Sequence, residues 1–212
     1  MNLRILAAAL AAAVLAPAAQ AQALNTVKIG VIRYAPDAKT NGISGIGVPP
    51  GADAEVGAAN TLLLTYERAF TPNLGLELVL GIPPRIHAKA TGTTAFLGDD
   101  VLSAKNVAPT LLLTWHFGQP GDTWRPYVGA GLNYTRFTGV RSKLADDVEM
   151  SDSLGWAAHA GIDYRINDQF GLFASIGASK VKSDLVARGS TVLKTTIDFR
   201  PTTYSAGLSY RF

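Results

Sequence analysis

The sequence predicts an all-β protein whose eight antiparallel strands close into an up-and-down transmembrane β-barrel. Three observations predict this fold class. Apolar and polar residues alternate along most of the chain after residue 21, the alternating segments number eight, and the links between them are short and long in turn. A period of two places the two sets of side chains on opposite faces of a strand. An even number of strands with alternating short and long links is the plan of an outer-membrane barrel.

Each alternating segment is long enough to cross a membrane as a tilted strand, which takes about 9–11 residues. At the C-terminus, for example, Leu208 and Tyr210 alternate with Ser209 and Arg211. Strands are expected at 24–34, 56–70, 73–84, 105–117, 124–138, 152–167, 169–183 and 195–212. Short links are expected at 71–72, 118–123 and 167–168, and long links at 35–55, 85–104, 139–151 and 184–195. Both termini and the short links then belong on the periplasmic side, with four long loops outside.

The first 21 residues have the pattern of a signal peptide. Arg4 supplies a basic start, residues 5–16 are an uninterrupted apolar run, and Pro17 ends that run. Ala19 and Ala21 then provide the small residues that a signal peptidase reads. The apolar run is shorter than the roughly 20 residues of a membrane-spanning helix. Cleavage is therefore expected after Ala21, leaving an exported barrel of residues 22–212.

The composition excludes several classes of protein. With 48% hydrophobic and only 17% charged residues, the chain does not resemble a disordered protein. The absence of cysteine excludes a disulfide scaffold, a thiolate zinc site, an iron–sulfur cluster and a cysteine nucleophile. A formal charge of +3 is too small to indicate nucleic-acid binding.

A secreted soluble barrel or sandwich is the competing fold, because alternation alone does not tell which face is inside. The distribution of charges and aromatic residues favours the membrane barrel. Aromatic residues lie near strand ends on the apolar face, as in an interfacial girdle: Phe70, Trp115, Phe117, Trp124, Tyr164, Phe170, Tyr210 and Phe212. Charged residues and histidines fall on the other face and are expected to form a lumen charge network: Lys28, Glu67, Glu77, His116, His159, Asp163, Arg165 and Arg211.

The charges of the predicted lumen have two interpretations. An eight-stranded barrel encloses a space that side chains or one small ligand fill, so a wide water-filled porin is excluded. Because unpaired buried charge is costly, the residues are expected to pair with one another. They then either plug the barrel without any transport role or form part of a channel.

Some apolar residues also fall on the inward face: Ile32, Leu63, Val79, Leu112 and Phe173. Apolar side chains depart from the polar lumen that is usual in membrane barrels. They predict an apolar channel or gate for a hydrophobic cargo, with Val79 and Phe173 as the preferred gate residues. Ordinary packing in a narrow barrel is the alternative.

The predicted external loops are partly apolar. The candidates for a loop funnel that captures cargo are Ile43, Ile46, Val48, Phe96, Leu97, Val101 and Leu102. Exposed apolar clusters often mark a surface that binds a ligand or contacts a membrane. Loops of this length also pack on themselves, and that alternative stays open.

Two prolines, Pro109 and Pro201, fall within predicted strands, although a closed barrel has no free edge strand to accept them. Each is expected to mark a bulge or an interrupted ladder. A gap near Pro83 and Pro84, or near Pro109, would let a cargo leave sideways. The alternative is a strand end just above the membrane, which is favoured for Pro201.

The sequence favours a protein that is not an enzyme. The histidines His87, His116 and His159 are not at the spacings of metal ligands, so no metal site is expected. His159 with Asp163 resembles acid–base machinery, but no nucleophile elbow accompanies the pair. A histidine in the lumen is instead expected to be a hydrogen-bonded member of the packed interior.

Several segments resemble the outer-membrane protein W (OmpW) family of Gram-negative bacteria. The most specific is Arg125-Pro-Tyr-Val-Gly-Ala-Gly-Leu-Asn-Tyr134. The others are 73–77 running to Pro83, 108–118, 152–156 through 161–164, and the closing 205–212. The resemblance implies a small eight-stranded barrel with a narrow channel for hydrophobic molecules, closed toward the periplasm and with a lateral exit. It also implies kinship with alkane-uptake barrels.

The combined prediction is an outer-membrane barrel of a Gram-negative bacterium that takes up small hydrophobic compounds. The first alternative is a structural or adhesive barrel with a sealed lumen, whose loops bind host or phage surfaces. The second is a lipid-modifying barrel enzyme. The expected partners are outer-membrane lipid, lipopolysaccharide, a small hydrophobic ligand and the barrel-insertion machinery, which reads Phe212. No cofactor and no nucleic-acid partner are expected.

Overall fold

The computed structural model describes residues 25–212 except 41, 46–47, 144, 146 and 189–191. The predicted signal peptide therefore lies outside the described residues. In the described chain, eight strands close a barrel: β1 (Asn25–Pro36), β4 (Ala59–Ala69), β5 (Leu74–Gly81), β8 (Thr110–His116), β9 (Trp124–Ser142), β11 (Ser153–Arg165), β12 (Phe170–Ser179) and β15 (Pro201–Arg211). In this order each strand pairs with the next one, and the last strand, β15, pairs with β1 and closes the ring. The predicted eight-stranded antiparallel fold is confirmed.

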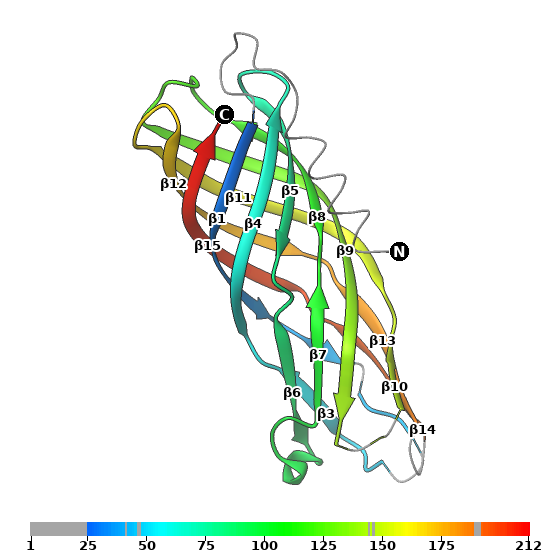
Figure 1. Ribbon diagram of the computed structural model, residues 1–212. Coiled ribbons are helices and arrows are strands. Elements are labelled where there is room, and N and C mark those ends of the chain that lie inside the picture. Colours follow the sequence, from blue (N-terminus) through cyan, green and yellow to red (C-terminus); the bar gives the residue numbers. More distant parts are fainter. Residues whose placement is uncertain (1–24, 41, 46–47, 144, 146, 189–191) are drawn as a thin grey trace.

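Both ends of the described chain lie at one end of the barrel (Figure 1). Asn25 and Phe212 exchange backbone hydrogen bonds of 2.9 and 3.1 Å, which closes the ring where the chain begins and ends. This end is called the terminal end below. A closed ring leaves no strand edge unpaired, as a membrane requires. Among the described residues, no helix is long and apolar enough to cross a membrane.

The outer face of the barrel is apolar, which decides between a membrane barrel and a soluble one. Ile29, Leu132 and Leu208 are each more than half exposed, whereas Lys28 is 1% and Glu77 2% exposed. A soluble barrel has the reverse arrangement. The side chains that face outward are therefore those that lipid solvates.

The predicted long links are not irregular loops. They contain seven strands in the described chain: β2 (Lys39–Thr40), β3 (Ala52–Val56), β6 (Arg85–Gly92), β7 (Leu102–Val107), β10 (Asp147–Met150), β13 (Lys182–Arg188) and β14 (Val192–Asp198), with a short 3-10 helix at Ala95–Leu97. Strands β7, β6 and β3 continue the sheet beside the second half of β9, and β10, β13, β14 and β2 form a separate sheet. Together they extend the barrel at the end opposite the termini, called the loop end (Figure 1).

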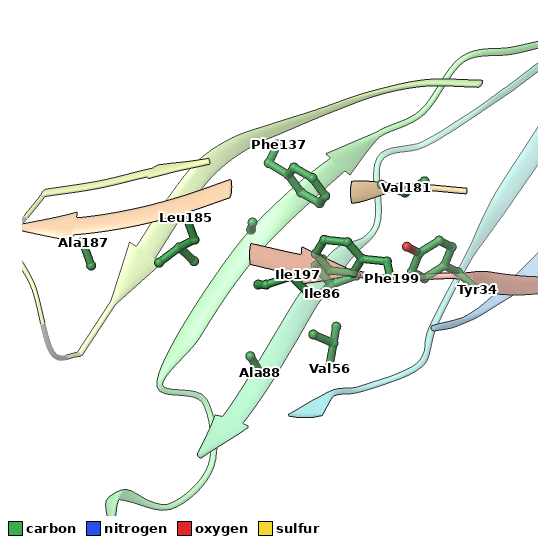
Figure 2. Packing of buried hydrophobic residues seen from close by; sticks show 11 residues of the cluster. Tyr34, Val56, Ile86, Ala88, Phe137, Val181, Leu185, Ala187, Ile197 and Phe199 are labelled. Carbon is green, nitrogen blue, oxygen red and sulfur yellow. The ribbon is translucent and has the colours of Figure 1, made fainter. Parts of the chain in front are cut away.

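A hydrophobic cluster fills the interior of this extension (Figure 2). The rings of Phe137 and Phe199 stack with their centroids 5.1 Å apart. Buried residues of both sheets and of the link between β12 and β13 surround them: Tyr34, Val56, Ile86, Ala88, Ala104, Val181, Leu185, Ala187 and Ile197. The extension is therefore held by its own apolar core, beyond the part of the barrel that is lined by polar residues.

Prolines interrupt one ladder of the barrel, as the sequence predicts. The pairing of β5 with β8 stops at Val79 and Thr110, and the pairing of β6 with β7 begins at Arg85 and Lys105. Residues 80–84 therefore lie opposite 106–109, five against four, with a register shift between the two ladders. Pro83, Pro84 and Pro109 have no N–H to donate across this space. One backbone hydrogen bond crosses it, donated by the Asn106 N–H to the Pro84 carbonyl at 2.9 Å. We call this stretch the ladder gap. Pro201, by contrast, stands at the first position of β15, a strand end, opposite Pro36.

Candidate functional site

A layer of charged side chains crosses the lumen near its middle. Lys28 of β1 reaches over the interior to Asp163 of β11, with 3.2 Å between the Nζ and Oδ1 atoms. The same ammonium group lies 4.1 Å from the centre of the Tyr127 ring, within the range of a cation–π interaction. Because β1 and β11 are not neighbours in the ring, this pair ties opposite parts of the wall together.

Histidines and carboxylates complete this charged layer. The Glu67 carboxylate contacts His116 Nε2 at 2.7 Å and accepts a hydrogen bond from Thr114 at 2.6 Å. The other nitrogen of His116 lies 3.6 Å from Asp163, and His159 lies 3.4 Å from Glu77. All these side chains are largely shielded from solvent, so their mutual contacts replace water. Six of the eight residues predicted for the lumen network meet here: Lys28, Glu67, Glu77, His116, His159 and Asp163.

Arg165 and Arg211, the other two predicted members, lie nearer the terminal end. They line a second cavity of about 430 Å³ together with Arg125, Glu67 and Asp163. The Arg165 guanidinium pairs with Asp168 and donates a hydrogen bond to the carbonyl of Gly121, both in the short turns of that end. Alternation along a strand identifies the face on which a residue lies but not its partners at a given height.

Glycines make room for the charged layer. A Cβ atom on Gly129 would lie 2.4 Å from His159 Nε2 and 3.1 Å from Thr114 Cγ2. Gly161 faces the Tyr127 ring in the same way, at 2.4 Å from Cζ. The absence of side chains at these two positions lets an imidazole and a phenol pack against the wall.

Gly129→Ala is expected to lower the free energy of unfolding by about 1–3 kcal/mol, because the His159 ring must leave its place beside Glu77. Urea unfolding of the barrel in lipid vesicles measures the change. Gly57→Ala is the matched control, since its Cβ would meet only the His87 carbonyl oxygen at 3.6 Å. Equal stability of the two variants would contradict the packing assigned to Gly129.

A cavity of about 190 Å³ lies on the loop side of the charged layer. All five apolar residues predicted to point inward line it: Ile32, Leu63, Val79, Leu112 and Phe173. Glu77, Tyr127 and His159 form its floor on the side of the charged layer. This loop-side cavity shares none of its lining residues with the cavity at the terminal end. The charged layer therefore separates two compartments of the lumen.

The loop-side cavity reaches the ladder gap. Residues 79–84 and 106–110, which flank and form the gap, all contribute to its lining. Pro83, Pro84 and Pro109 are among them. The cavity thus borders the one stretch of the eight-stranded ring, among the described residues, where prolines interrupt the ladder between adjacent strands.

The residues predicted to form a loop funnel occupy different environments. Phe96 is 81% exposed at the tip of the β6–β7 hairpin with Leu97 beside it, whereas Val101 is 7% exposed and Leu102 packs against the hydrophobic cluster. Ile43 and Val48 are half-buried, and Ile46 lies outside the described residues. None of the described funnel residues lines the loop-side cavity.

Sequence reasoning did not single out several residues of the lumen. Tyr127 is 2% exposed and sits between Lys28 and the two lumen histidines. The alternation along β9 could have predicted that Tyr127 points inward, because Trp124, Pro126 and Val128 of the same strand face outward. Tyr34 lines the cavity and belongs to the hydrophobic cluster, so it joins the two regions. Tyr34 joins the two regions only because the extension folds over it, and no pattern in the neighbouring sequence predicts that contact.

Comparison with known proteins places this barrel among its relatives. The sequence model of the OmpW family matches residues 24–212. "Outer membrane protein W" of Vibrio cholerae is 35% identical over 165 residues, which are 73% of this chain and 75% of that protein. "Dibenzothiophene metabolism operon protein PahQ" of Pseudomonas aeruginosa is 29% identical and covers 74% of this chain and 72% of its own.

A solved structure agrees with the fold. The crystal structure of the outer membrane protein OprG from Pseudomonas aeruginosa superposes with a TM-score of 0.79 at 26% sequence identity. It covers 89% of this chain and 95% of its own. The match over nearly all of the described barrel, with the family model over 24–212, shows that the chain belongs to the OmpW family of outer-membrane proteins.

Proposed function

We propose that this barrel is a narrow channel for the uptake of small hydrophobic molecules across the outer membrane. The observation that carries the proposal is the loop-side cavity, which is floored by the charged layer and bordered by the ladder gap. Its wall is mainly apolar, with neutral Asn, Ser and Thr side chains among its lining residues. An apolar molecule gains free energy by leaving water for such a cavity. The charged layer offers it no comparable gain further along the lumen.

The size of the cavity supports a single small cargo. An apolar cavity of about 150 Å³ is enough to hold a benzene molecule. A volume of about 190 Å³ therefore suits one small aromatic ring system or a short alkyl chain. The name of the relative PahQ points to the same chemical class, since dibenzothiophene is a flat apolar aromatic compound.

The route we propose enters at the loop end and leaves sideways. It assigns the loop end to the outside of the cell and the terminal end to the periplasm. Straight passage would break the contacts of Lys28 with Asp163 and of His116 with Glu67. A hydrophobic molecule at the ladder gap instead passes from an apolar cavity into lipid, without crossing a charged layer.

Uptake of a medium-chain alkane by cells with and without the protein tests this function. Uptake is expected to depend on the protein and to fall to the level of cells that lack it in Phe173→Asp and Val79→Asp. Val79→Phe, which adds only apolar atoms to the cavity, is expected to have the same effect. Leu208→Phe adds the same ring to the lipid-facing surface and is expected to leave uptake unchanged.

All variants are compared at equal surface expression, with heat-modifiable migration on gels to confirm folding. If cells with the wild-type protein take up no more alkane than cells without it, the proposed channel is overturned. That result would favour a structural or adhesive barrel, because a sealed and paired lumen is what such a role requires.

A further inference from the structure

Four cations gather on the outer face of the extension, immediately beyond the ladder gap. Arg85 is the first residue of β6, Lys105 lies on β7, and Arg136 and Arg141 lie on β9. Arg85 is directly opposite Lys105, and Ser103 of β7 is directly opposite Arg141. Their chain neighbours Ile86, Ala104 and Phe137 are buried in the hydrophobic cluster, so the cations point outward. We call these four residues the cationic face.

The height of the cationic face on the barrel matches the level of lipid headgroups. The apolar outer face of the barrel is called the apolar band. On the outer side of β9, the exposed residues Leu132 and Tyr134 belong to it, and Arg136 is the next outward residue. On the β5–β6 side, Ile82 is 59% exposed and Arg85 follows within three residues. Cations at the boundary between an apolar band and water attract the phosphate groups of lipids.

The charges of this face are poorly compensated within the protein. Like charges directly opposite each other on neighbouring strands are destabilising, and Arg85 and Lys105 form such a pair. The Arg85 guanidinium donates to two neutral oxygens, Ser103 Oγ at 3.2 Å and the Gly139 carbonyl at 3.3 Å. In the described part of the chain, the one ion pair of these four cations joins Arg136 to Asp152 at 4.0 Å.

The carboxylates nearby are engaged elsewhere. Asp100 hydrogen-bonds His87 at 2.6 Å, and this bond, with smaller contributions from Lys143 and Arg85, holds the pKa of Asp100 below its usual range. Glu55 pairs with Lys89 at 3.1 Å. An external anion that bridges Arg85 and Lys105 would relieve their repulsion, since no carboxylate of the described residues forms an ion pair with either of them.

We propose that the cationic face binds the phosphate groups of lipopolysaccharide in the outer leaflet. A guanidinium binds a phosphate through two parallel hydrogen bonds, and Lys105 adds a third charge-assisted contact. The acyl chains of the same molecule would lie along the exposed leucines of the apolar band. The inference rests on the proposed orientation, with the loop end outside, but not on the transport of any cargo.

Binding of purified lipopolysaccharide to the purified full-length barrel in phosphocholine micelles tests the proposal. Wild-type protein is expected to bind it about tenfold more tightly than Lys105→Gln or Arg141→Gln, the loss for one charge-assisted contact. The matched control is Lys89→Gln with Arg188→Gln, which removes two cations of the loop end that have carboxylate partners. The control is expected to bind like the wild type.

Two further arms identify the ligand. Lipopolysaccharide with its phosphates removed is expected to bind the wild type as weakly as intact lipid binds the Gln variants. Inorganic phosphate at millimolar concentration is expected not to compete, because it has no acyl chains to hold it at the apolar band. Equal binding of phosphorylated and dephosphorylated lipid, full competition by free phosphate, or equal affinity of the variants and the control would each overturn the proposal.

The stability of the same variants gives an independent readout. Without lipopolysaccharide, Lys105→Gln is expected to unfold at an equal or higher urea concentration than the wild type, because one member of a like-charge pair is gone. With lipopolysaccharide the order is expected to reverse, since ligand binding stabilises the folded state. A lysine with a merely structural role would lower stability in both conditions, and that outcome would also contradict the assignment.

Discussion

Lys28→Met is expected to lower the free energy of unfolding of the barrel by about 3–5 kcal/mol. Lys28 is 1% exposed and its ammonium group lies 3.2 Å from Asp163. Methionine fills nearly the same space but leaves the carboxylates of Asp163, Glu67 and Glu77 without the cation at the centre of the layer. Removing one partner of a buried ion pair is costly because the other charge remains buried and uncompensated.

Urea unfolding in phosphocholine vesicles measures this effect, with the fluorescence of the lipid-facing tryptophans as the signal. Arg33→Met is the matched control, because Arg33 lies on the same strand and is exposed on the outer face. The double variant with Asp163→Asn is expected to recover part of the loss. A loss below about 1 kcal/mol, the range of a surface ion pair, would show that the layer is not a closed network.

The faces of the barrel strands were predictable from the sequence because alternation is a geometric property of a strand. The five inward apolar residues and the inward charges follow from it directly. Contacts across the lumen were not predictable, because they depend on the stagger of strands that are far apart in the ring. Arg165 illustrates the limit: it is on the expected face but pairs with Asp168 in a turn of the terminal end.

The long loops predicted at the loop end are largely strands, although part of that pattern is visible in the sequence. Ser183, Leu185 and Ala187 of β13 are buried and alternate with exposed Lys182, Asp184 and Arg188. The alternation of buried and exposed residues therefore continues past residue 183, where the predicted strand ends. Alternation does not tell where a strand leaves the membrane, so the predicted boundary was wrong. Val101 is buried for a related reason, since the folded extension covers apolar side chains that an open loop would expose.

Phe199→Ala is expected to destabilise the loop end by about 3–5 kcal/mol while leaving the barrel strands folded. Phe199 is 1% exposed and stacks on Phe137 at the centre of the hydrophobic cluster (Figure 2). Its removal leaves a cavity that the surrounding strands fill only in part. Because the cluster is separate from the charged layer, the substitution lowers the free energy of local opening of the extension and not that of global unfolding.

Hydrogen exchange of the backbone amides distinguishes local from global opening. Amides of β13 and β14 are expected to exchange about 10²–10⁴ times faster in Phe199→Ala, the factor that such a free energy implies. Amides of β1 and β15 are expected to keep their wild-type rates. Phe96→Ala is the control, because that residue is 81% exposed and contributes little buried area. Equal acceleration throughout the chain would mean that the extension and the barrel unfold as one unit.

The same variant tests how the hydrophobic cluster relates to the channel. Tyr34 and Val181 belong to the cluster and also line the loop-side cavity, so the cluster forms the cavity's boundary toward the loop end. If a cargo enters from that side, the cluster has to open transiently, and a looser cluster is expected to raise alkane uptake. Faster exchange in β13 and β14 with unchanged uptake would instead indicate that the cargo enters at the ladder gap, where Pro83, Pro84 and Pro109 interrupt the regular pairing of the wall.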